Sequence, residues 1–263
     1  MEDLLHIMRI LRGEGGCPWD REQNHRSIRN NLIEETYEVV EAIDTDDRTL
    51  LREELGDVLL QVVFHSQMED ECNSFNFNDV CDGICKKLIH RHPHIFGNVI
   101  ANSSEEVLKN WDIIKQKEKN QETTASTLEA VSRALPSLVR SCKVQKRAAK
   151  VGYCYPDVSG AIADLKSEIL ELEQAIAASD SENISDELGD VLFSAVNVSR
   201  LLKKDPEEAL CFSTDKFIRR FTIAEELASQ QDKKLVDCTA GELDTLWKEA
   251  KKKDNKKFGG TTK

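Results

Sequence analysis

Apolar residues recur at helical spacing along almost the whole chain. In one such stretch, Leu55, Val58, Leu59 and Val62 lie three or four positions apart, which places them on one face of a helix. No segment shows the strict alternation of apolar and polar residues that predicts a half-buried strand. The pattern therefore predicts an all-α protein. The expected helices lie near 2–12, 26–44, 48–71, 77–91, 103–119, 128–150, 158–178, 182–203, 206–230 and 240–254.

The second half of the chain repeats the first. Residues 34–66 align with 167–199 without gaps, and the run ELGDVL occurs in both segments, beginning at Glu54 and at Glu187. Charged and aromatic positions are repeated along with apolar ones, so the two copies are predicted to share chemistry as well as a fold. The repeated pairs are Glu35 and Glu168, Glu38 and Glu171, Asp57 and Asp190, Lys87 and Lys216, Arg91 and Arg220, Trp111 and Trp247, and Lys115 and Lys251.

A polar stretch between the two copies predicts the domain boundary. Residues 119–127 read KNQETTAST, which is typical of a linker. We therefore expect an N-terminal module over 1–119, a linker over 120–127, a C-terminal module over 128–254 and a flexible tail over 255–263.

Paired carboxylates are the most informative repeated feature. Glu35 and Glu38 lie three positions apart on one predicted helix, and Glu54 and Asp57 have the same spacing on the next. Antiparallel packing would bring these acids together, where they repel one another unless a cation joins them. Oxygen-only ligands favour a hard ion, Mg²⁺ or as a substitute Mn²⁺. The ligands predicted in the second copy are Glu168, Glu171, Glu187 and Asp190.

A solvated helix face and a di-iron centre fit these acids less well. Acid pairs on a helix usually belong to a solvated face, but matched spacing and repetition favour a site. A di-iron bundle requires Glu-x-x-His on its helices, and no His follows any of these acids at that spacing. Gly56 and Gly189 interrupt the second helix of each copy, which predicts a close approach of helices beside the site.

Composition narrows the class of protein. Lys and Arg number 36 against 48 Asp and Glu, a net charge of −12, which argues against a protein that binds nucleic acid. No apolar run predicts a membrane span, and Glu2 and Asp3 argue against a secretion signal. The eight cysteines include no CxxC pair, so we interpret them as reduced thiols of a cytoplasmic protein.

Basic and aromatic residues follow the carboxylates in each copy. A Mg²⁺ site of this kind suits a phosphate ligand, and basic side chains can neutralise the negative charge that remains on the phosphate. Arg91 precedes Pro93 and equally fits the usual cation at a helix C-terminus, while both tryptophans fit a packed core as well as a stacked base. The candidates for nucleotide binding are Arg91, Trp111, Lys115, Lys216, Arg220 and Trp247.

These motifs resemble the MazG family of nucleoside triphosphate pyrophosphohydrolases over nearly the whole chain. The resemblance is carried by EExxE at 34–38, ExxD at 54–57, GCPWD at 16–20 and RHPHIF at 91–96. It implies tandem all-α modules that dimerise into four-helix bundles, with Mg²⁺ held by the acids. It also implies hydrolysis of NTP and dNTP to the monophosphate and pyrophosphate, for nucleotide-pool cleansing or for lowering (p)ppGpp.

The acids also suggest how water is activated. We hypothesise that one metal-associated carboxylate deprotonates the attacking water, with Glu34 or Glu38 as candidates in the first copy and Glu171 in the second.

The second copy departs from the family pattern. Ser167 replaces the first Glu of EExxE, and Asp164 and Asn183 stand where lysines are expected. In the first copy His90 stands where a second Arg often occurs. Two alternatives stay open. One is a non-catalytic helical scaffold that binds nucleotides or a protein, which these substitutions support for the second copy only, and the other is a phosphatase that releases inorganic phosphate.

Overall fold

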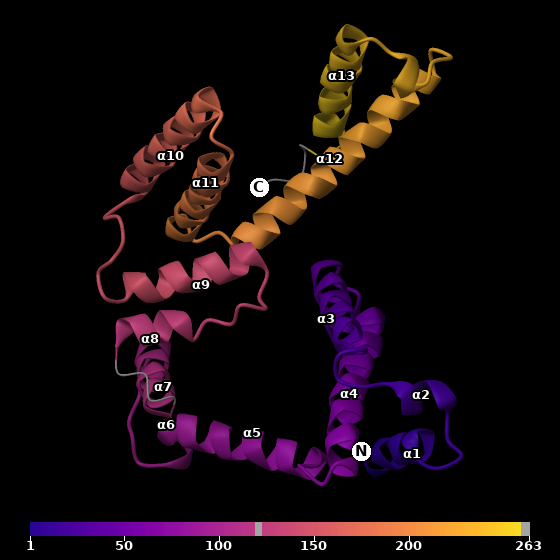
Figure 1. The fold of residues 1–263 in the computed structure, drawn as a ribbon, viewed down its shortest axis with the longest axis vertical. Helices are drawn as coiled ribbons and strands as arrows, with labels where there is room; N and C mark the ends of the chain where they lie inside the picture. Colours follow the sequence, from indigo (N-terminus) through magenta and orange to yellow (C-terminus); the bar gives the residue numbers. More distant parts are fainter. Residues whose placement is uncertain (119–122, 259–263) are drawn as a thin grey trace. The chain divides into compact units, whose positions relative to one another are not determined.

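Helices make up all the regular secondary structure of residues 1–118 and 123–258, which the computed structural model describes. This confirms the all-α prediction. The chain divides into two compact units, one formed by Met1–Glu118 and the other containing the described residues from 123 onward (Figure 1). Within the described ranges, no helix combines the length and the apolar character needed to cross a membrane.

A helical hairpin forms the centre of the first unit. Its two helices, α3 (Arg29–Asp44) and α4 (Arg48–Glu71), pack along each other. Asp47 immediately precedes α4, and its carboxylate caps the helix by accepting hydrogen bonds from the backbone N–H groups of Thr49 (2.9 Å) and Leu50 (3.0 Å). The other helices are α1 (Glu2–Arg12), α2 (Pro18–Glu22), α5 (Phe77–Arg91), α6 (Pro93–Phe96) and α7 (Ser104–Glu118). The main core of the unit contains Met8, Ile28, Val63, Phe64 and Met68.

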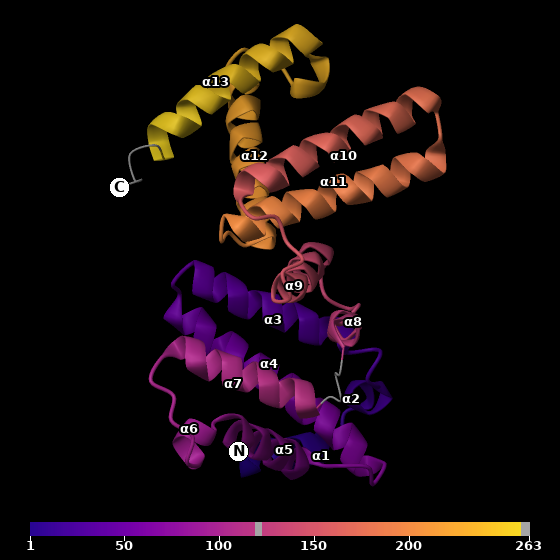
Figure 2. The ribbon, with the colours of Figure 1, turned by 90° about the vertical axis from the view of Figure 1, so that its left-hand side faces the viewer.

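Two hairpins form most of the second unit. In Figures 1 and 2, α10 (Val158–Ala178) lies beside α11 (Ser181–Leu201). The second hairpin pairs α12 (Pro206–Ser229) with α13 (Ala240–Phe258), around a core of Ala224, Leu227, Ala228, Leu246 and Ala250. The remaining elements are α8 (Thr124–Glu129), α9 (Ser137–Ala149) and the 3-10 helix η1 (Leu235–Asp237).

The structure corrects the prediction around the middle of the chain. The single helix expected over 128–150 is two helices, because Pro136, which lacks a backbone N–H, precedes α9. Residues 124–127 of the expected linker belong to α8, where the Thr127 carbonyl accepts a hydrogen bond from the Arg147 guanidinium. Residues 120–122 lie outside the described residues. At the other end, α13 continues to Phe258, beyond the start of the expected tail, and 259–263 lie outside the described residues.

Candidate metal centre

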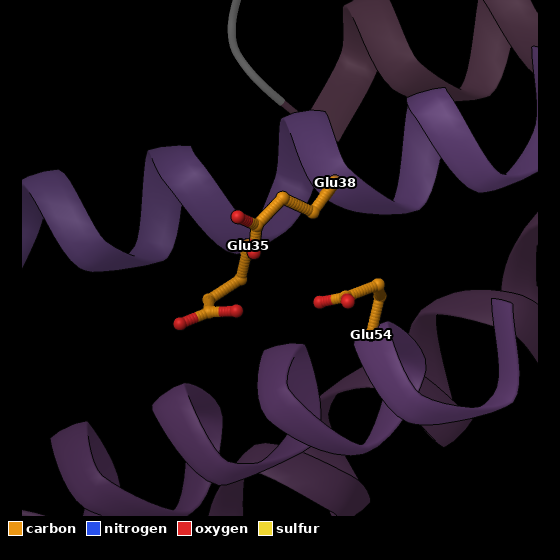
Figure 3. Close-up of side chains that lie close together, drawn as sticks. All are labelled: Glu35, Glu38 and Glu54. Carbon is orange, nitrogen blue, oxygen red and sulfur yellow. The ribbon is translucent and has the colours of Figure 1, made fainter. Parts of the chain in front are cut away.

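Three carboxylates come together between α3 and α4. Glu35 and Glu38 project from α3 toward Glu54 of α4, and one oxygen from each lies within 4.8 Å of the others (Figure 3). The spacing of Glu35 and Glu38 puts both on the same side of α3. The structure therefore brings together the first three predicted metal ligands of this copy.

The electrostatics of this cluster favour a bound cation. Glu54 is 8% exposed, and burial raises its pKa, with a further rise from the negative charge of Glu38. Burial also raises the pKa of Glu35, helped by the charges of Asp57 and Glu38. Asp57 thus acts on the cluster electrostatically, although it lies outside the group of three.

The acids of the first cluster lack a basic counter-charge within the part of the chain that the structure describes. None of Glu35, Glu38 and Glu54 forms an ion pair there. Partly buried carboxylates without a counter-charge are costly, and an oxygen-only donor set suits a hard divalent cation. The residues present therefore fit Mg²⁺ or Mn²⁺.

A second cluster occupies the corresponding place between α10 and α11. Glu168, Glu171 and Glu187 also each place one oxygen within 4.8 Å of the others. Burial raises the pKa of Glu168 and of Glu187, and in both cases the charge of Glu171 is the next cause. Asp190 contributes to both rises, as Asp57 does in the first copy. The repeated sequence has thus produced a repeated site.

The neighbours of the second cluster differ from those of the first. The Ser167 hydroxyl donates a hydrogen bond to Oε1 of Glu171 (3.2 Å). Asp164 accepts hydrogen bonds from the Tyr155 hydroxyl (2.5 Å) and the Ser194 hydroxyl (2.8 Å), and the first of these bonds raises the pKa of Tyr155 to about 12. Hydroxyl groups therefore bind Asp164, at the position where the sequence analysis expected a lysine.

Two sequence expectations fit the structure less well. Glu34 is exposed on α3 and lies outside the group of three carboxylates. Gly56 and Gly189 have open space beside them: a Cβ atom added at either would lie more than 4 Å from every described heavy atom outside its own helix. The predicted close approach of another helix at these glycines is therefore wrong within each unit.

The candidate nucleotide-binding residues of the first copy lie together between α5 and α7. The Arg91 guanidinium lies 5.3 Å from the centre of the Trp111 ring, and the Lys115 ammonium lies 5.4 Å from it. Arg91 also forms an ion pair with Glu118, to whose Oε2 its Nε donates at 3.0 Å. The indole Nε1 of Trp111 is buried and has no hydrogen-bond partner among the described residues.

In the second copy, the corresponding residues lie between α12 and α13. Arg220 donates from Nε to Oδ2 of Asp254 (2.8 Å), and the Trp247 ring packs against Phe217 with 5.2 Å between ring centres. Lys216 is exposed on α12. Sequence reasoning missed the acids Glu118 and Asp254, although each follows its tryptophan at the same spacing.

Each unit keeps its carboxylates and its arginine on different helix pairs. In the first unit, α5 leads away from α4 to α6 and α7, and in the second, the α12–α13 pair extends away from the α10–α11 hairpin (Figure 1). In each unit the predicted site residues therefore form two separate groups, the carboxylates on one helix pair and the basic and aromatic residues on another.

Together these features define a tandem-repeat helical protein in which each repeat carries a carboxylate cluster that could hold a metal ion. Residues 23–96 and 158–222 match the family described as "MazG nucleotide pyrophosphohydrolase domain". The chain belongs to the MazG family.

Two relatives that the chain matches over nearly their full length have names that agree with this assignment. The chain is 41% identical over 250 residues to the Thermotoga maritima protein named nucleoside triphosphate pyrophosphohydrolase/pyrophosphatase MazG, with 95% of both chains covered. It is 39% identical over 257 residues to the nucleoside triphosphate pyrophosphohydrolase of Escherichia coli K12, covering 97% of this chain and 98% of the relative. It is also 43% identical over 251 residues to the Bacillus subtilis protein YabN, covering 95% of this chain but about half (51%) of that relative.

Proposed function

We propose that this chain is a nucleoside triphosphate pyrophosphohydrolase of the cytoplasm. It would add water across the bond between the α and β phosphates of an NTP or dNTP, which yields the monophosphate and pyrophosphate. The proposal is supported above all by the cluster of three carboxylates, which occurs once in each unit. The names of the T. maritima and E. coli relatives support the same reaction. A role in cleansing the nucleotide pool would follow.

The acids have two tasks in this proposal. Glu35, Glu38 and Glu54, with Asp57 nearby, would hold Mg²⁺, and Mn²⁺ would substitute. When bound, such an ion neutralises phosphate charge and lowers the pKa of water. Glu34 or Glu38 would accept the proton of the attacking water in the first copy.

The second copy would use the corresponding residues. Its metal ligands would be Glu168, Glu171 and Glu187, with Asp190 nearby, and Glu171 would also be the general base.

The basic clusters would bind the nucleotide. Arginine matches phosphate oxygens in two-point hydrogen bonds, while lysine acts as a point charge. Arg91 and Lys115 in the first copy, and Lys216 and Arg220 in the second, would stabilise negative charge on the phosphates. Trp111 and Trp247 would contact the base.

A second copy of the chain would complete each site. The α3–α4 hairpin exposes large apolar side chains, including Tyr37 (52%) and Leu55 (53%), and the α10–α11 hairpin exposes Leu188 (48%) and Leu192 (54%). Exposed apolar faces of this kind are typical of helix–helix interfaces. We therefore propose a homodimer in which hairpins pack into four-helix bundles, and in which the partner brings a basic cluster to each carboxylate cluster.

Product analysis tests this function. Purified protein is incubated with Mg²⁺ and a panel of NTPs and dNTPs, and the products are separated by anion-exchange chromatography, with EDTA as the metal-free control. Monophosphate and pyrophosphate in equal amounts, lost with EDTA, are expected. Inorganic phosphate would show a phosphatase instead, and tight binding without turnover would show a nucleotide-binding scaffold.

A further inference from the structure

The arginine of each basic cluster is held from one side by an acid on the neighbouring helix. In the first unit, Nε of Arg91 donates to both Glu118 oxygens, at 3.3 Å and 3.0 Å, and Nη2 donates to Oε2. The Arg91 side chain is only 10% exposed, so this bond forms largely away from water. Glu118 thereby joins the end of α7 to the end of α5.

The second unit repeats this arrangement with a shorter acid. Nε of Arg220 donates to Oδ2 of Asp254 at 2.8 Å, and Nη2 donates to Oδ1 of Asn255 at 3.2 Å. The Asp254 side chain is 4% exposed, and it also accepts a hydrogen bond from Nε of Arg219. Each unit thus pairs its arginine with an acid, although the acid is aspartate instead of glutamate here and is more deeply buried than Glu118.

The same edge of the guanidinium is used in both units. The contacts occupy Nε and Nη2, and Nη1 of neither arginine makes a hydrogen bond to a residue that the structure describes. A guanidinium is planar and rigid, so fixing one edge sets the direction in which Nη1 points. The arginine bonds also lower the pKa of Glu118 and of Asp254, which keeps both acids ionised near neutral pH.

We infer that Glu118 and Asp254 are positioning residues, which aim Nη1 of Arg91 and of Arg220 at the phosphate oxygens of the nucleotide. This inference rests on the proposed function. The acids act through the arginines and do not touch the substrate. An arginine that is already oriented loses little side-chain entropy on binding phosphate, and small errors in its position would slow the reaction.

The test removes the acid charge and keeps the side-chain shape. In Glu118→Gln/Asp254→Asn, made in the full-length chain, kcat/KM for an NTP is expected to fall about 10- to 100-fold, because misplaced groups of this kind cost up to about 100-fold. The matched control, Glu105→Gln/Glu225→Gln, removes the same charges from exposed positions of α7 and α12 and should keep wild-type kinetics.

A double-mutant cycle separates positioning from a structural role. The same acid substitutions are made in an Arg91→Ala/Arg220→Ala background, with the thermal midpoint measured for every variant. If the acids act through the arginines, the substitutions change kcat/KM less than about twofold there. The inference is overturned by wild-type kinetics of the acid variant, or by an equal loss in both backgrounds.

Failure of the proposed reaction would be recognised separately. If the wild-type protein releases no pyrophosphate, we would instead measure the ATP affinity of each variant in the double-mutant cycle by tryptophan fluorescence. The acid variant should then bind ATP about tenfold more weakly, a loss of about 1.4 kcal/mol, and only when the arginines are present. Unchanged affinity would overturn the inference on this readout as well.

Discussion

The two carboxylate clusters share a geometry but differ in their surroundings. Each places three oxygens within 4.8 Å of one another on a helical hairpin. The first cluster includes the buried Glu54, and the residue before its first ligand is Glu34. In the second cluster the corresponding residue is Ser167, which forms a hydrogen bond with Glu171. The hairpin thus fixes where the ligands lie, while neighbouring residues set the charge around them.

The basic clusters differ in a parallel way. Trp111 has two cations over its ring, Arg91 and Lys115, whereas Trp247 packs against Phe217. The Trp111 ring therefore makes cation–π contacts, whereas the Trp247 ring makes an aromatic contact. Substitutions at matched positions can show which of these differences affects function.

The largest effect is expected from removing one ligand of each cluster. Glu38→Ala should weaken Mg²⁺ binding to the first unit more than about 100-fold, because even residues behind the metal ligands contribute about 10- to 100-fold. Glu171→Ala should do the same in the second unit. Isothermal titration calorimetry should show half the sites lost in each variant. Control substitutions at the exposed acids Asp44 and Glu173 should leave the stoichiometry unchanged.

Matched core substitutions would compare the stability of the two units. Val63 and Val196 occupy corresponding positions in the repeat and are 0% and 1% exposed. Replacing either by Ala removes buried methyl groups and should lower the free energy of unfolding of its own unit by about 2 kcal/mol. Hydrogen exchange measured by mass spectrometry would locate the loss, and an equal loss in both units from one substitution would contradict the prediction that each substitution acts on its own unit.

Exchanging the residue that precedes each cluster would test the charge difference directly. Ser167→Glu should strengthen Mg²⁺ binding in the second unit, and Glu34→Ser should weaken it in the first, each by about tenfold, or about 1.4 kcal/mol. Titrations in Glu38→Ala and Glu171→Ala backgrounds would isolate one unit at a time. Equal affinities before and after the exchange would show that this position does not act on the metal.

A smaller effect is expected from pH. Folding raises the pKa of Glu35, Glu54, Glu168 and Glu187, so the metal-free folded chain takes up protons before the unfolded chain does as the pH falls. The metal-free protein should therefore become more stable as the pH falls from neutral toward these pKa values. Mg²⁺ competes with the same protons, so its affinity should fall as the pH falls over that range. Calorimetric titrations at several pH values would check the sign.

Much of the helical framework was predictable because it depends on local signals. Periodic apolar residues predict α4, the capping acid Asp47 marks its start, and the repeat identified which acids recur. The break before Pro136 was missed because the apolar pattern continues across it, and tertiary contacts such as the bond from Arg147 to Thr127 decide the local path.

The sequence identified most residues of the site, but it did not reveal which of them contact one another. Sequence spacing placed Glu35 and Glu38 on one face, and packing of α3 on α4 added Glu54. The pairing of Arg91 with Glu118 depends on how α5 meets α7, which no local spacing reveals. Aligning the two copies on Trp111 and Trp247 would have shown that an acid, Glu118 or Asp254, follows each tryptophan at the same spacing.

The two carboxylate clusters together should account for all turnover of an NTP. We would measure pyrophosphate release by Glu38→Ala/Glu171→Ala beside the two single variants. The double variant should fold, as shown by its circular dichroism spectrum, and its turnover should fall at least about 100-fold. Wild-type turnover by the folded double variant would show that catalysis does not depend on these clusters.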